Sequence, residues 1–145
     1  MHTWQAWGIT LLRITLGVIF VMHGYLGLAV IGPAALGEYT TRMGFPPAFA
    51  TILAWYLILA HTVGGLLLII GLWTRLAALA QVPIMASAVF LHHLQQGFFM
   101  RGIILDAGAG VAIAGGYEYS LLVLVATVAL IFLGGGALAI DGFTR

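Results

Sequence analysis

Four long runs of apolar residues dominate this sequence, and each is about as long as a helix that crosses a bilayer. About 20 residues, rising about 1.5 Å each, span the roughly 30 Å hydrocarbon core. The runs cover about residues 8–31, 47–73, 75–94 and 117–140. Only 6% of the 145 residues are charged, against about 25% in soluble domains. Polar groups therefore cannot cover a water-soluble surface, and the sequence excludes a soluble fold.

The backbone in these runs must satisfy its own hydrogen bonds, because lipid offers no partners. The runs lack the alternating polarity of barrel strands, so helices are expected. We predict an all-α integral membrane protein, a four-transmembrane-helix bundle that forms a single domain over residues 1–145. Gly32-Pro33 ends the first run and Pro46-Pro47 opens the second. Pro83 predicts a kink in the third.

The links between the runs differ in character. Only about Thr74-Arg75 separates the second and third runs, which predicts a tight antiparallel hairpin. The link over residues 32–46 is longer and polar. The link over residues 95–116 is small and apolar from Gly102 onward, which predicts a re-entrant or interfacial segment packed on the bundle. In the last run, Gly134 to Gly136 should loosen the final helical turns.

Charge and cysteine content exclude several classes of function. The formal net charge is +1 without a basic stripe, so nucleic acid is not an expected partner. The chain has no cysteine, which excludes disulfides and thiolate metal sites. Arg13, Arg75 and Arg145 fall on the side of the termini, against Arg42 and Arg101 on the other side. By the positive-inside rule, both termini are expected to be cytoplasmic.

Two histidines lie deep inside apolar runs, where ionisable groups are costly and therefore informative. His23 in the first run and His61 in the second are at similar depth, so they can meet if the two helices are neighbours. Small residues beside them would let the backbones approach closely: Gly24, Gly27, Gly64 and Gly65. The pair could tie the helices together by hydrogen bonds, or it could line a binding site.

The third run adds a polar seam. Its members recur at intervals of four, three, four and three residues and so share one helical face: Gln81, Met85, Ala88, His92 and Gln95. The candidate pocket therefore consists of His23, His61, Gln81 and His92. Its candidate ligand is a quinone, or less favourably a haem b held by two imidazoles. We predict no metal site, because the adjacent His92 and His93 point about 100° apart on a helix.

Four further polar residues are candidates for function. We interpret Arg13 as an interface residue that extends its charge toward the membrane surface, rather than as a residue that binds substrate. Glu118 begins the fourth run, where a helix N-terminus favours a carboxylate. Glu118 and the neighbouring Tyr117 would lie near His92, and an Arg101–Glu118 pair is expected at the mouth of the bundle.

Four segments, taken in order, resemble the DoxX family of small four-helix bacterial and archaeal membrane proteins. They are LLRITLGVIFVMHG, HTVGGLLLIIGLWTRLAAL, HHLQQGFFMRG and GGYEYSLLVL. Positions that fit the family pattern are Arg13, His23-Gly24, Arg75, Gly97 to Phe99 and Gly116 to Tyr119. Two positions depart from it. The family usually has a glutamate where this chain has His61, and a Gln-Lys after its His-Gly where this chain has Tyr25-Leu26.

The resemblance implies a bacterial or archaeal inner-membrane protein linked to redox systems, such as the quinol oxidase and thiosulfate:quinone oxidoreductase subunits of the family. The expected function is an accessory, non-catalytic subunit of a larger respiratory or photosynthetic complex, in contact with lipid and with other membrane subunits. The alternative is a subunit that itself binds quinone or haem. A small-molecule transporter is a distant third, because no inverted repeat is visible.

Overall fold

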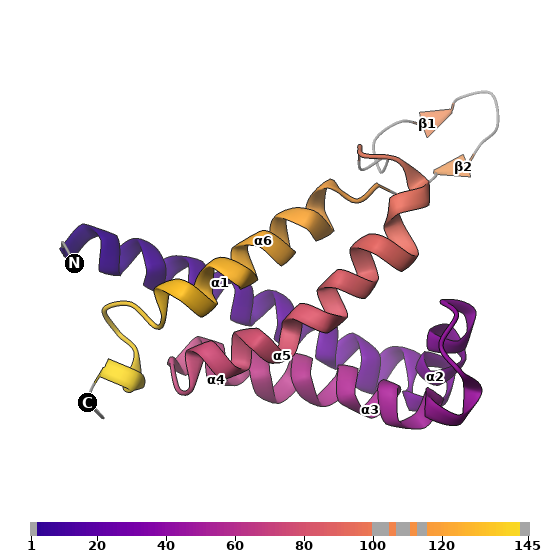
Figure 1. Cartoon of the computed structure of the whole chain (residues 1–145), viewed down its shortest axis with the longest axis horizontal. Coiled ribbons are helices and arrows are strands. Elements are labelled where there is room, and N and C mark those ends of the chain that lie inside the picture. The colour runs from indigo at the N-terminus through magenta and orange to yellow at the C-terminus, as the bar shows by residue number, and fades with distance from the viewer. Residues whose placement is uncertain (1–2, 100–104, 107–110, 113–115, 143–145) are drawn as a thin grey trace.

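The computed structural model describes residues 3–99, 105–106, 111–112 and 116–142. Three of its helical segments are long and apolar enough to cross a membrane: Thr3–Ile31, Pro47–Ile70 and Thr74–Gln96. A shorter apolar helix, Glu118–Leu133, follows. Large apolar side chains are exposed along these helices, as expected of a surface that faces lipid. The predicted helical membrane architecture is confirmed (Figure 1).

The elements have the following bounds. The first membrane segment is α1 (Thr3–Tyr25) and the π-helical η1 (Leu26–Ile31), followed by α2 (Pro33–Arg42). The second is η2 (Pro47–Phe49), α3 (Ala50–Leu59), the π-helical η3 (Ala60–Gly64) and α4 (Gly65–Ile70). The third is α5 (Thr74–Ser87), the π-helical η4 (Ala88–His93) and η5 (Leu94–Gln96). The antiparallel pair β1 (Leu105–Asp106) and β2 (Val111–Ala112), α6 (Glu118–Leu133) and η6 (Ile140–Gly142) complete the chain.

The helices pack in pairs. Helix α1 lies along α4 and η3, α5 lies along α6, and α2 packs on α3. Figure 1 shows α5 and α6 crossing the other helices and diverging from them toward the end where α2 lies. Buried apolar residues join α1, α4, α5 and α6 in one core, among them Leu16, Phe20, Leu68, Ala78 and Leu130. A second, smaller cluster joins α2 and α3. The divergence matters because residues of α1, α2, α5 and α6 line the cavity described below.

The hairpin between the second and third segments turns earlier than predicted. The second helix ends at Ile70, and the turn consists of Gly71 to Trp73 rather than Thr74-Arg75. Gly71 has φ +73° and Trp73 has φ +49°, both in the left-handed region. Glycine enters that region without a Cβ penalty, so Gly71 terminates the helix and Thr74 already begins α5.

The fourth helix is shorter than predicted. It ends at Leu133 rather than at about Ile140, because Gly134 and Gly136 adopt φ angles of +79° and +80° and reverse the chain. The segment after the turn packs back on the bundle. The N–H of Ala137 donates to the carbonyl of Ala6 at 3.2 Å, and the N–H of Asp141 donates to the carbonyl of Gly71 at 3.0 Å. The glycines thus redirect the chain, where looser helical turns had been expected.

The two long links between the apolar runs can be compared with their predicted structures to different extents. Residues 32–46, expected to be a polar connection, contain the helix α2, which begins with Pro33 at a position where a missing N–H costs nothing. Residues 95–116 were expected to form a re-entrant or interfacial segment. Most of them lie outside the described residues, which here are 95–99, the two-residue strands β1 and β2, and Gly116.

Candidate functional site

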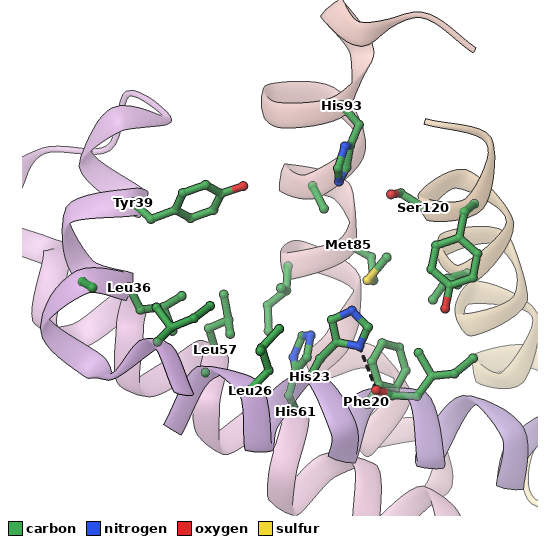
Figure 2. A pocket seen from close by; sticks show the side chains of 18 of the residues that line it. Phe20, His23, Leu26, Leu36, Tyr39, Leu57, His61, Met85, His93 and Ser120 are labelled. Atoms are coloured by element: carbon green, nitrogen blue, oxygen red, sulfur yellow. Dashed lines mark hydrogen bonds between the residues drawn. The ribbon is translucent and has the colours of Figure 1, made fainter. Parts of the chain in front are cut away.

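A cavity of about 500 Å³ lies between α1, α2, η3, the α5–η4 helix and α6 (Figure 2). His23, His61 and Phe20 lie together at one side of it, where α1 meets η3. Apolar side chains form most of its walls, among them Leu26, Leu57, Met85 and Val123. Tyr39, His93 and Ser120 line it from three other elements. The cavity therefore combines apolar walls with a few polar groups, as ligand sites do.

His23 and His61 are neighbours, as their predicted depths required. Their ring centroids are 6.1 Å apart with an interplanar angle of 62°. Phe20 packs edge-on against the other side of His61, at 5.3 Å and 68°. His61 is only 4% exposed, whereas His23 faces the open part of the cavity. The predicted juxtaposition of the two imidazoles is confirmed.

Close backbone contact between α1 and the second helix brings these histidines together. A Cβ built on Gly24 would lie 2.8 Å from the backbone nitrogen of Thr62, and one built on Gly65 would lie 2.9 Å from the carbonyl oxygen of Gly17. The small-residue contact was predicted for Gly24 and Gly65, but Gly17 was missed. Gly64, also expected at this contact, faces Gln81 on α5 instead.

The two histidines differ in their hydrogen bonds, and neither is bonded to the other helix among the described residues. Nδ1 of His23 lies 2.9 Å from the carbonyl oxygen of Ile19, one turn earlier in α1. Nδ1 of His61 is buried and has no hydrogen-bond partner among the described residues. The alternative in which these histidines tie helices together by hydrogen bonds is therefore wrong for the described part of the chain. Their contact across the helices is ring against ring.

Gln81 and His92, the other two members of the predicted pocket, do not line the cavity. Gln81 is fully buried and its Nε2 donates to the carbonyl of Ala60 at 2.5 Å. His92 packs edge-on against Tyr39 at 5.2 Å and against His93 at 4.4 Å, and it is His93 that lines the cavity. The predicted seam assumed 3.6 residues per turn, but the wider π-helical turn of η4 changes which histidine faces inward.

The three π-helical segments among the described residues all contribute to the cavity. Leu26 and Ile31 come from η1, His61 comes from η3, and His93 comes from η4. In η1 the wide turn is visible in the bond from the N–H of Gly32 to the carbonyl of Gly27, five residues earlier. Such turns are rare and gather at functional sites. The apolar pattern carries no signal for them.

Two charged residues of α2 also line the cavity. Glu38 and Arg42, one turn apart on α2, line it and approach each other to 3.8 Å while remaining largely exposed. Tyr39 lies between them in sequence and points toward the cavity (Figure 2). Burial raises the pKa of the Tyr39 phenol above its usual value, so its hydroxyl stays protonated and able to donate at neutral pH.

Arg13 is buried at the opposite end of the bundle, and its predicted extension toward the membrane surface is wrong. It is fully enclosed, and its guanidinium donates to the carbonyl oxygens of Leu68, Ile69, Gly135 and Leu138. The bonds to Ile69 and Gly135 are both 2.8 Å long. The last carbonyls of α4 have no partner within their helix, and the glycine turn after α6 brings further acceptors. Arg13 thus serves as an internal helix cap and does not line the cavity.

The remaining candidates lie near the start of α6. Glu118 is in the first turn of that helix, as predicted, and Tyr117 packs edge-on against Phe98 at 5.3 Å. Neither lines the cavity, whereas Tyr119 and Ser120 do. Arg101, and with it the predicted Arg101–Glu118 pair, lies outside the described residues. Within the described part of the chain, no three His, Asp or Glu side chains are grouped to hold a metal ion.

Comparison with known proteins adds one finding. The sequence model of the DoxX family matches residues 8–94, which include most of α1, all of α2 to α5, and the cavity histidines His23, His61 and His93. No curated protein and no solved structure matches the chain. The matched residues are more than half of the chain and include the first two segments on which the resemblance was based, LLRITLGVIFVMHG and HTVGGLLLIIGLWTRLAAL. The chain is therefore a multi-pass membrane protein that belongs to the DoxX family.

Proposed function

We propose that this DoxX protein is an accessory subunit of a larger respiratory or photosynthetic redox complex, and that its cavity binds the headgroup of a quinone. The observation that carries the proposal is His61, which is buried at the cavity wall with an unpartnered ring nitrogen. A buried polar atom without a partner costs about 1–3 kcal/mol. A ligand that hydrogen-bonds in the cavity would recover that energy.

The chemistry of the lining favours a flat ring with oxygen substituents. Phe20 and the two imidazoles offer faces and edges for an aromatic ring, and His23 and His61 offer nitrogen atoms to its oxygens. Aliphatic walls, including Leu26 and Leu57, suit an apolar tail. A volume of about 500 Å³ is within the range of sites for small ligands. When bound, a quinone would supply electron transfer coupled to proton transfer.

The proposed accessory role rests on two features of the sequence, the absence of cysteine and the histidine at position 61. The chain has no cysteine, hence no thiol relay and no ligands for an iron–sulfur cluster. His61 also replaces the acidic residue that the resemblance predicts at its position. Electrons to or from a ligand in this cavity would have to pass through another subunit. We therefore place the protein beside a partner that carries the electron-transfer centres.

A haem between the two imidazoles fits the structure poorly. Axial ligands of a haem need room between them for the planar macrocycle. Directly beside His23, a Cβ on Gly24 would lie 2.8 Å from the Thr62 nitrogen and 3.1 Å from the carbonyl carbon of His61. The two helices are in backbone contact there, so a macrocycle would have to force them apart. The quinone is therefore the ligand that we propose.

In the membrane, we propose four spans in a single domain over residues 1–145, with α6 as the fourth span. Its 16 residues are about 24 Å long. The start of α1, the α4–α5 turn and the chain after α6 lie at one end of the molecule, as four spans require (Figure 1). We assign that end to the cytoplasmic side of a bacterial or archaeal inner membrane by its arginines. Residues 95–116 would form a re-entrant or interfacial segment at the other end.

Titration of the purified protein with a short-chain benzoquinone tests the binding proposal. Ala88, which lines the cavity from η4, is replaced in Ala88→Trp to fill the space. The matched control is Leu91→Trp on the same helix, where the side chain is 49% exposed and does not line the cavity. Binding in the micromolar range that Ala88→Trp weakens at least about tenfold and Leu91→Trp leaves unchanged would support the site.

Two results would contradict the proposal. One is the absence of saturable binding to the unmodified protein. The other is binding that both tryptophan variants reduce equally, because that would indicate partition into the apolar surface. Quinone found in an organic extract of the unmodified protein, but not of a folded Ala88→Trp protein, would be independent support.

A further inference from the structure

The hydrogen bond of His23 fixes which of its nitrogens faces a ligand as an acceptor. A carbonyl oxygen can only accept, so the nitrogen that lies 2.9 Å from the Ile19 carbonyl, Nδ1, carries the hydrogen. In a neutral imidazole the other nitrogen, Nε2, then has a lone pair and no hydrogen. Figure 2 shows the His23 ring with Nδ1 directed at its own helix and its other edge toward the cavity. Nε2 makes no hydrogen bond among the described residues.

An acceptor at this place discriminates between two kinds of oxygen. A ring carbonyl has only lone pairs and cannot donate to Nε2 of His23, whereas a ring hydroxyl can. His61 offers another nitrogen nearby. Its Nδ1 is buried without a partner at the same end of the cavity as His23. A hydroxyl serves this nitrogen in either tautomer, because its oxygen also accepts.

We propose that the His23–His61 pair selects ligands with an aromatic hydroxyl, and that the cavity therefore prefers the reduced, quinol form over the oxidised quinone. This inference rests on the proposed function and adds the chemical form of the ligand. It follows from the fixed tautomer of His23 together with the unpartnered nitrogen of His61. Tyr39, on the far side of the cavity, is a hydroxyl donor and remains available to the oxygen at the other end of the ring.

A matched pair of redox-inert probes tests this preference: a 4-alkylphenol and the corresponding 4-alkylanisole, which has a methoxy group in place of the hydroxyl. Both are titrated at pH 8, where free imidazole is neutral. The phenol should bind at least about tenfold more tightly, the equivalent of about 1.4 kcal/mol. The short-chain benzoquinone should compete with the phenol and should be the weaker ligand.

The variant His23→Phe keeps a ring of similar size and removes the acceptor. It should bring the phenol-to-anisole ratio to about one, chiefly by weakening the phenol. A ratio that stays at ten in this variant would mean that the methyl group is excluded by size, and would overturn the inference. Equal binding of both probes to the unmodified protein would also overturn it while leaving quinone binding intact. Absence of binding for both probes and for benzoquinone would overturn the proposed function itself.

Nitrogen-15 NMR of histidine-labelled protein gives a readout that does not need the variant to fold. His23 should show a protonated Nδ1 and an unprotonated Nε2, and the Nε2 signal should shift when the phenol is added but not when the anisole is added. A hydrogen on Nε2 of His23 in the free protein would contradict the argument at its first step.

Discussion

Arg13 shows how backbone carbonyl groups can stabilise a charged side chain inside an apolar bundle. Its guanidinium has five N–H donors, and the structure supplies carbonyl oxygens from two places. Leu68 and Ile69 belong to the end of α4, and Gly135 and Leu138 belong to the turn after α6. Arg13 therefore joins three parts of the chain that are distant in sequence.

We expect Arg13→Met to destabilise the protein by at least about 2 kcal/mol, because buried carbonyls lose a charged donor and methionine cannot replace it. Thermal unfolding in detergent measures the effect. The matched control is Arg42→Met, whose side chain is 80% exposed and pairs with Glu38 only at the surface. That change should stay within about 0.5 kcal/mol. Equal losses for both variants would contradict the capping role.

Replacing His61, unlike replacing Arg13, should not lower the stability of the protein. Because its Nδ1 is buried without a partner, replacing the imidazole in His61→Leu removes an unsatisfied atom and should leave stability unchanged or slightly higher. Quinone binding should nevertheless fall at least about tenfold. A histidine that tied helices together would instead contribute about 0.6–2 kcal/mol. Loss of stability with unchanged quinone binding would therefore restore the interpretation of His61 as a helix tie.

At the scale of elements, the sequence predicted what depends on composition and depth. The apolar runs predicted the helices, and the positions of His23 and His61 in them predicted the contact. The amino-acid pattern did not predict features that depend on the path of the backbone. The π-helical turns leave no mark in an apolar pattern, so His92 was chosen in place of His93. Arg13 was misread because its acceptors come from a glycine turn whose direction the sequence does not specify.

The crossing of α1 with η3 should tolerate no side chain at Gly24. A Cβ there would lie 2.8 Å from the backbone of Thr62, so Gly24→Ala should separate the helices and destabilise the protein by about 1–3 kcal/mol. Gly8→Ala, on the same helix with nothing within 4 Å, should be neutral or stabilising by up to about 1 kcal/mol. Gly24→Ala should also weaken benzoquinone binding. Equal stability of the two variants would contradict the close crossing.

At the scale of the whole molecule, the segment after α6 is hydrogen-bonded to the α4–α5 turn at one end. The carboxylate of Asp141 accepts hydrogen bonds from the N–H groups of Trp73 and Thr74, at 2.7 and 2.8 Å. The chain after α6 is thus held to the start of α5, while α2, which contributes to the cavity wall, lies at the other end (Figure 1). This separation predicts that the two ends face opposite sides of the membrane.

Single cysteines introduced into this cysteine-free chain can report the two sides. Trp73→Cys, at a position 63% exposed in the α4–α5 turn, should react with a membrane-impermeant thiol reagent only after the cells are opened. Arg42→Cys, on α2, should react in intact cells. Labelling of Trp73→Cys alone in intact cells would reverse the orientation. Labelling of both from one side would contradict the four-span arrangement.

The most direct test of the central claim is photolabelling with an azido-quinone, followed by mass-spectrometric mapping of the modified residues. The account predicts adducts on cavity residues from separate helices, such as Leu26, Leu57 and Met85, which excess short-chain benzoquinone suppresses. Exposed apolar residues outside the cavity, such as Leu91, should be labelled weakly and without competition. Labelling spread over the lipid-facing surface, unaffected by competitor and equal in Ala88→Trp, would contradict a quinone site in this cavity.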